Sequence, residues 1–186
     1  SMDKGQEIHS QVIKTGLFET NLTVGNSLID MYVKCGLLAE AKEVFESLPV
    51  KDVVSWTSLI TGYSQLGQAN VALDIYRRMC TENIVPNSVT FTVLLTACSH
   101  AGFLEEGQNV FDEMSTLYCF IPTVEHYMCL IDLFARAGHF DEAKTVLDSF
   151  SFSGSVPQFL VYSGCLGQRD EYEAWETDIL TNSTFY

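Results

Sequence analysis

Three polar residues stand at equivalent places in a repeated unit of this chain: Asn26, Thr57 and Thr92, separated by 31 and 35 residues. Their amide and hydroxyl groups can donate and accept directional hydrogen bonds, which discriminate between partners by roughly 1–3 kcal/mol when they act in pairs. A local bond to the backbone near a helix start is the alternative interpretation for Asn26. The recurrence at three places favours recognition of a ligand.

Covalent and metal chemistry are not indicated. The four histidines are scattered, the six cysteines form no CxxC pair, and the HxE…PCxxC signature of zinc deaminases is absent. We interpret the cysteines as reduced core thiols rather than as metal ligands or disulfides. A GxSxG elbow and a glycine-rich phosphate loop are also absent. We therefore expect a protein that is not an enzyme and binds no metal or cofactor.

Residues 55–87 predict two helices joined by a turn at Gly67. One apolar face has the i, i+3, i+4, i+7 spacing of a helix and consists of Trp56, Leu59, Ile60 and Tyr63. The second helix carries a matching stripe of Val71, Ala72, Ile75, Tyr76 and Met79. One hairpin cannot bury both faces, so a similar hairpin is expected on each side.

The other hairpins are marked by turn glycines at spacings of 31, 35 and 36 residues: Gly36, Gly67, Gly102 and Gly138. Glycine suits the end of a helix because it adopts positive φ without strain. Each second helix carries one small residue that permits close helix packing: Ala41, Ala72, Gly107 and Ala143. A helical-hairpin repeat of this period predicts an all-α fold, an α-solenoid of stacked antiparallel hairpins.

We expect one domain, residues 1–186, built from full repeats at 22–52, 53–87, 88–123 and 124–154. A half repeat is expected at 3–21, with the stripe Ile8, Val12 and Ile13, and a divergent helical hairpin at 155–186.

The formal net charge of −14 argues against a general affinity for nucleic acid unless positive groups gather in one place. We interpret most acids as solvated outer-face residues. No apolar run approaches the roughly 20 residues that span a bilayer, so no membrane association is expected. Ser1 and Met2 look like a cloning remnant. A native transit peptide is therefore expected to have been cut away.

Four segments resemble the pentatricopeptide-repeat (PPR) proteins of plants, in the subclass with alternating long, short and standard repeats. They are GNSLIDMY followed by KCG at 25–36, VSWTSLI at 54–60, LLTACSHAG at 94–102, and EHY leading to RAG at 125–138. The resemblance implies a right-handed superhelix in which 22–52 and 124–154 are short repeats, 53–87 is standard and 88–123 is long. Residues 155–186 stand where the first C-terminal extension motif would be, but they depart from it at Gln158.

The resemblance implies that each repeat reads one base of single-stranded RNA through its fifth and last residues. The pairs are Asn26 with Asp52, Thr57 with Asn87, Thr92 with Thr123, and Met128 with Gly154. Uridine is implied for the first pair and adenine for the second. The third has no clear preference, and the fourth is expected not to read a base.

Further contacts follow from the resemblance. The second residue of a repeat would sandwich the base, which assigns this role to Thr23, Val54 and Val89, whereas Glu125 is a poor neighbour for phosphate. Phosphate contacts are expected from Lys34, His100 and Arg136. For Lys34 and Arg136 the alternative is an ordinary cation at a helix C-terminus, favoured by the helix dipole.

The full-length parent is implied to be an organellar RNA-processing factor that specifies sites of cytidine-to-uridine editing. Its implied partners are an RNA-editing deaminase or accessory editing factors, and its compartment is the mitochondrion or the chloroplast, with the mitochondrion favoured. The alternative is a protein-interaction scaffold like the tetratricopeptide repeats, or a homodimer through the exposed solenoid ends. The acidic balance favours this alternative, and the unequal periods disfavour it.

Overall fold

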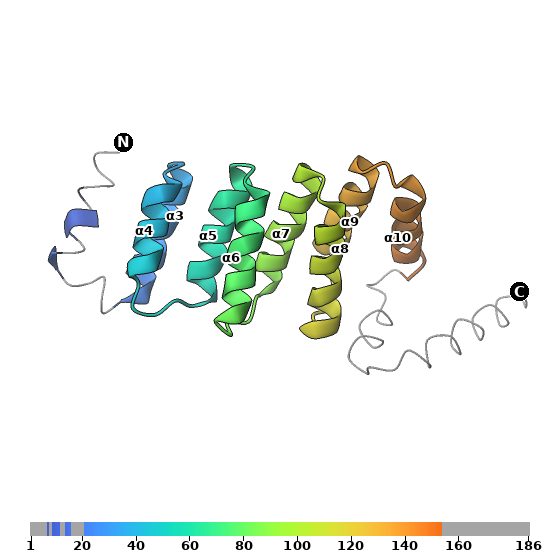
Figure 1. Ribbon diagram of the computed structural model, residues 1–186. Helices are drawn as coiled ribbons and strands as arrows, with labels where there is room; N and C mark the ends of the chain where they lie inside the picture. Colours follow the sequence, from blue (N-terminus) through green and yellow to red (C-terminus); the bar gives the residue numbers. More distant parts are fainter. Residues whose placement is uncertain (1–6, 8, 12–13, 16–20, 154–186) are drawn as a thin grey trace, which may run out of the picture.

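The computed structural model describes residues 7, 9–11, 14–15 and 21–153. The stripe expected at Ile8, Val12 and Ile13, and the hairpin expected at 155–186, lie outside the described residues. From residue 21 to residue 153 the structure is a succession of helical hairpins (Figure 1).

Each hairpin contains a first and a second helix. The first helices are α3 (Leu22–Lys34), α5 (Val53–Gln65), α7 (Ser88–Ala101) and α9 (Val124–Arg136). The second helices are α4 (Leu38–Ser47), α6 (Ala69–Thr81), α8 (Leu104–Asp112) and α10 (Phe140–Ser153), with a π-helical turn, η1 (Glu113–Leu117), extending α8.

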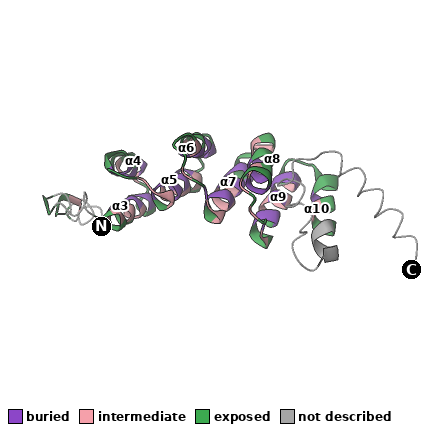
Figure 2. Cartoon of the chain, turned by 90° about the horizontal axis from the view of Figure 1, so that it is seen from below, coloured by how far each residue is buried: buried purple, intermediate pink, exposed green. Residues whose placement is uncertain are grey.

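The hairpins stack into two layers. Seen from below, α4, α6 and α8 form one row and α3, α5, α7 and α9 the other, with buried residues facing between the rows (Figure 2). Each first helix packs against the first helix of the next hairpin. The expected α-solenoid is confirmed.

The core is centred on the predicted apolar stripe of α5. Trp56, Leu59 and Ile60 are at most 1% exposed. The Trp56 ring packs edge-on against Phe45 of α4 at a centroid distance of 4.7 Å. On α6 the stripe is shifted, because Leu73 is buried whereas the predicted Val71 is only partly covered.

The turn glycines and the small residues behave as predicted. Gly36, Gly67, Gly102 and Gly138 have φ between 72° and 82°. The small residue of α8, Gly107, is buried, and a Cβ added there would overlap Cδ2 of Leu133 on α9. Close packing of consecutive hairpins therefore depends on this position.

The cysteines follow the expectation only in part. Four are free thiols: Cys98 is buried and Cys80 and Cys129 are half-buried, but Cys35 is exposed, so it is not the core residue expected. Cys119, which follows η1, is disulfide-bonded, so the expectation of a reduced thiol is wrong at that position. Burial raises the pKa of the Cys98 thiol to about 11, as expected for an apolar core residue.

Candidate functional site

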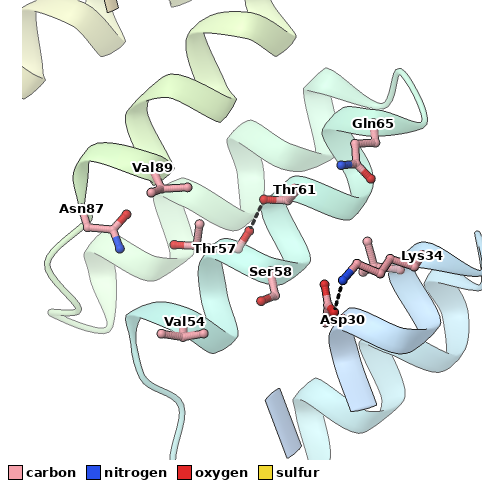
Figure 3. Close-up of a pocket in the computed structure, with 10 residues that line it drawn as sticks. Asp30, Lys34, Val54, Thr57, Ser58, Thr61, Gln65, Asn87 and Val89 are labelled. Atoms are coloured by element: carbon pink, nitrogen blue, oxygen red, sulfur yellow. Dashed lines mark hydrogen bonds and ion pairs between the residues drawn. The ribbon is translucent and has the colours of Figure 1, made fainter. Parts of the chain in front are cut away.

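The first helices line a groove made of two adjoining cavities. The first, of about 320 Å³, lies between α3, α5 and α7 and is lined by polar and aliphatic side chains that include Asp30, Lys34, Thr57 and Asn87 (Figure 3). The second, of about 410 Å³, lies between α5 and α7 and includes Thr92 and His100. Thr61 and Gln65 line both cavities, so the groove is continuous across the second and third repeats.

At the first junction between repeats, Asn26 of α3 contacts the residue that precedes α5. Its Nδ2 donates to Oδ1 of Asp52 at 3.1 Å, and its Oδ1 accepts from the Ser55 hydroxyl at 2.6 Å. Asp52 is the N-cap of α5, where its carboxylate accepts the Ser55 N–H at 2.9 Å. The two residues expected to read one base are therefore hydrogen-bonded to each other.

The pKa of Asp52 reflects these contacts. Partial burial opposes ionisation, but hydrogen bonds from the Ser55 backbone, from Asn26 and from the Ser55 hydroxyl outweigh it, so the pKa lies below its ordinary value of 3.8. At neutral pH Asp52 is a carboxylate and acts only as a hydrogen-bond acceptor. Asn26 must therefore turn its amide nitrogen, rather than its oxygen, toward Asp52.

The second junction repeats this arrangement with different side chains. Oγ1 of Thr57 lies 2.8 Å from Oγ1 of Thr90, which in turn donates to Oδ1 of Asn87 at 3.0 Å. Asn87 is the N-cap of α7 and accepts the Thr90 N–H at 2.9 Å. Thr57 is only 8% exposed, although it lines the first cavity. Ligand access to this residue is therefore limited to a small part of its side chain.

The third junction uses a histidine as the connecting residue. Nε2 of His126 lies 3.1 Å from Oγ1 of Thr92, and the Thr123 N–H donates to Nδ1 of His126 at 3.0 Å. Because Nδ1 accepts this backbone proton, the neutral imidazole carries its own proton on Nε2. Thr92 and Thr123 are thereby linked through a ring that is 1% exposed.

Sequence reasoning missed the three connecting residues, Ser55, Thr90 and His126. Each is the third residue of its first helix and closes a capping box with the residue before that helix. The usual capping box has Glu or Gln at this position, so Ser, Thr and His gave only a weak pattern. A search for any polar residue three positions after a predicted N-cap would have found them.

The second residues of the repeats are solvent-accessible. Val54 and Val89 are 49% and 58% exposed and line the first cavity together with Thr57 and Asn87 (Figure 3). Thr23 is also exposed. In the fourth repeat Met128 is 56% exposed, and Gly154 lies outside the described residues. The valines offer apolar surfaces on either side of the second polar pair.

The three expected phosphate ligands differ in their surroundings. Lys34 pairs with Asp30 one turn earlier at 2.6 Å, and Arg136 pairs with Asp132 at 2.8 Å. Both pairs lie at i, i+4 and are largely exposed to solvent, where such contacts contribute little. His100 is exposed and lines the second cavity. The charge of Lys34, which lines the first cavity, is therefore partly neutralised by Asp30, whereas Arg136 and Asp132 line neither cavity.

Metal binding and membrane insertion find no support in the described part of the chain. Within it, no cluster of three or more His, Cys, Asp or Glu side chains is arranged to hold a metal ion. None of its helices combines the length and hydrophobicity needed to cross a membrane.

The chain is similar to curated plant proteins. It is 42% identical over 162 residues to a pentatricopeptide repeat-containing protein of Arabidopsis thaliana, with 87% of this chain and 20% of that protein covered. Two further relatives from Arabidopsis thaliana, named mitochondrial and chloroplastic, are 39% and 41% identical, with 90% and 87% of this chain covered and 23% and 21% of theirs. The chain thus spans about a fifth of the length of these relatives.

Solved structures share the fold. The pentatricopeptide repeat protein PPR10 from maize superposes with a TM-score of 0.69 at 23% identity, covering 96% of this chain and 26% of PPR10. A structure of PPR10 in complex with an 18-nt psaJ RNA element gives a TM-score of 0.66 at 24% identity, covering 87% and 23%. Residues 51–100 match the PPR repeat family, and residues 26–53, 89–119 and 125–154 match the PPR repeat. The chain therefore belongs to the pentatricopeptide repeat family.

Proposed function

We propose that this chain is a sequence-specific single-stranded RNA-binding module that reads one base per repeat. The observation that carries the proposal is the linkage of the fifth and last residues across three successive junctions: Asn26 with Asp52, Thr57 with Asn87, and Thr92 with Thr123. Thr57 and Asn87 line the first cavity and Thr92 lines the second, whereas Asn26 and Asp52 line neither. The RNA complex of the structural neighbour PPR10 supports RNA as the ligand.

The chemistry of each pair suits a base edge. Asp52 is an acceptor that can take the N3–H of uridine, and Asn26 supplies an amide for a neighbouring carbonyl oxygen. Thr57 and Asn87 together offer an acceptor and a donor, which complement the amino group and N1 of adenine. Val54 and Val89 are placed to hold a base between apolar surfaces, with Thr23 in the same role one repeat earlier. Phosphate contacts are assigned to Lys34, His100 and Arg136.

The proposal extends to the parent protein. The alternating short, standard and long repeats at 22–52, 53–87 and 88–123 favour an organellar factor that specifies cytidine-to-uridine editing sites. Such a factor would work with a deaminase or accessory editing proteins, and we place it in the mitochondrion in preference to the chloroplast. Relatives with each of these two labels support an organelle in general.

Binding by this segment alone should be weak. Stacking contributes ~1–3 kcal/mol per base at two or three readable repeats. Association removes several kcal/mol in ordering. Together with the net charge of −14, these terms place the dissociation constant on the order of tens of micromolar or higher.

The test is NMR titration of the chain with short single strands that contain U-A, C-A or U-G at the readable positions. We expect the U-A strand to give the strongest binding. Asn26→Ala and Thr57→Ala should each abolish the preference at one position only. Base preferences that both variants leave unchanged would overturn the assignment of these residues.

Self-association or peptide binding is the alternative. The exposed Phe140 and Leu147 of α10, 69% and 45% accessible, favour an apolar contact at that end of the described solenoid. Analytical ultracentrifugation over a hundredfold concentration range distinguishes the two proposals. A concentration-dependent dimer together with no RNA binding would support the scaffold.

A further inference from the structure

We infer that the third residue of a repeat helps to select the base read by the preceding repeat, through Ser55, Thr90 and His126. None of the three is assigned to base contact. Each is a positioning residue, hydrogen-bonded to both members of a base-reading pair. The inference rests on the proposed function and adds a third determinant to each pair.

The same connection recurs at all three described junctions. Ser55 contacts Asn26 and Asp52, Thr90 contacts Thr57 and Asn87, and His126 contacts Thr92 and Thr123, with distances of 2.6–3.1 Å between polar atoms. All three connecting side chains are at most 1% exposed. Because water is excluded from them, the protein alone decides where their protons lie.

At the second junction the proton positions follow from the distances. Oγ1 of Thr90 accepts the Asn87 N–H at 3.2 Å and lies 3.0 Å from Oδ1 of Asn87. Two acceptor oxygens at that distance would repel each other, so the Thr90 hydroxyl proton lies between them. Thr57 must then donate its own proton to Thr90. Toward the groove, Thr57 retains acceptor lone pairs, and Asn87 retains its amide nitrogen as a donor.

This polarity has a consequence for recognition. An acceptor at Thr57 and a donor at Asn87 match the Watson–Crick edge of adenine, which presents an amino donor beside the N1 acceptor. Guanine presents an acceptor oxygen and an N1–H donor instead. A Thr57 hydroxyl that donates toward the groove, together with a flipped Asn87 amide, would favour guanine. The Thr90 hydroxyl therefore sets the polarity of Thr57, and the Thr90 N–H helps to hold the Asn87 amide, without contact to either purine.

The other junctions use the same logic with different groups. The Ser55 hydroxyl lies 2.6 Å from Oδ1 of Asn26 and 3.0 Å from Oδ1 of Asp52, so the two acceptors share its proton, and the Asn26 amide nitrogen stays on Asp52. At the third junction the Thr92 hydroxyl donates to the Ser88 carbonyl at 3.0 Å, and Nε2 of His126 lies 3.1 Å from both Oγ1 of Thr92 and that carbonyl. Thr92 is thereby held as an acceptor, as Thr57 is.

The test compares Thr90→Val with Thr90→Ser. Valine has the shape of threonine and keeps the backbone N–H that donates to Asn87, so the helix cap persists, but it has no hydroxyl. Serine keeps the hydroxyl. Binding of each variant is measured by NMR titration with two strands that differ only in adenine or guanine at the second readable position, and thermal melting confirms folding.

We expect wild type and Thr90→Ser to share one adenine-to-guanine preference, and Thr90→Val to reduce that ratio about five- to tenfold. A merely structural role would weaken binding to both strands equally. An unchanged ratio in Thr90→Val overturns the inference alone. Wild type that binds neither strand overturns the proposed function and this inference with it. If Thr90→Val does not fold, the same test is made at the first junction with Ser55→Ala. The quantity compared is then the ratio of binding to two strands that differ only in uridine or cytidine at the first readable position.

Discussion

The amide nitrogen of Asn26 and the carboxylate of Asp52 are hydrogen-bonded at 3.1 Å across two consecutive hairpins. Asp52 also begins α5 as its N-cap. One residue therefore ends a repeat, starts the next first helix and belongs to a proposed base-reading pair. Substitutions at such positions must be designed so that stability and recognition are separated.

Asp52→Ala and Asp52→Asn should differ in this respect. Alanine removes the cap and should lower the free energy of unfolding by about 1 kcal/mol, whereas asparagine keeps an acceptor for the Ser55 N–H. Asparagine also introduces a donor, which suits N3 of cytidine better than the N3–H of uridine. Urea unfolding and RNA titration of both variants measure the two effects. Equal destabilisation by Ala and Asn would contradict the capping role.

The lowered pKa of Asp52 predicts an acid-sensitive contribution to stability. A carboxyl whose folded pKa lies below its unfolded value of 3.8 stabilises the fold above that value and loses the contribution as the pH falls through the folded pKa. Wild type should therefore lose its advantage over Asp52→Asn between about pH 5 and pH 2. Thermal melts of both proteins across this range measure the difference. A difference in stability between wild type and Asp52→Asn that increases as the pH falls would contradict the prediction.

The carboxylates beside the groove cations should oppose RNA binding. Asp30→Asn and Asp132→Asn free Lys34 and Arg136 from their ion pairs, so each variant should bind a single strand about two- to fivefold more tightly. Each additional phosphate contact should steepen the dependence on log salt by about 0.7. Asp74→Asn is the matched control, because Asp74 pairs with Arg77 on the second helix α6, whereas Asp30 and Asp132 stand on first helices. An equal gain in RNA affinity in Asp74→Asn would indicate that only the change in net charge matters.

Gly107 should resist enlargement. Although alanine is the better helix former, its Cβ would overlap Leu133 and lie 3.1 Å from Cβ of Cys98. Overpacking of this kind costs about 1–3 kcal/mol. Urea unfolding of Gly107→Ala, with Gln108→Ala as the exposed neighbour on the same helix, tests the expectation. Equal stability of the two variants would mean that α8 and α9 can move apart to accommodate the added methyl group without a loss of free energy of unfolding.

Much of the fold followed from local pattern. Two predictions depend only on residues within one hairpin: the apolar spacing of Trp56, Leu59 and Ile60, and the turn at Gly67. The structure confirms both. The shift of the α6 stripe toward Leu73 could not be predicted, because it depends on which side chains of α6 the neighbouring helices α5 and α7 cover.

The candidate site was less accessible to sequence reasoning. The ion pair of Lys34 with Asp30 could have been found, because it follows the i, i+4 rule. The contact of Thr57 with Thr90 could not, because it joins residues 33 positions apart whose alignment is set by the packing of α5 on α7. The same packing leaves Thr57 with little exposed surface, which its polar character did not indicate.

The capping boxes have a consequence for modular engineering. The determinant inferred for one base lies three residues inside the helix of the following unit, as with Thr90 for the pair Thr57 and Asn87. If a single repeat is transferred and the transferred segment ends at its last residue, the hydroxyl of the following repeat is lost. The third residue of the new neighbouring repeat then takes its place. Cassettes that include the first helical turn of the following repeat would keep the base-reading pair together with the third residue that positions it.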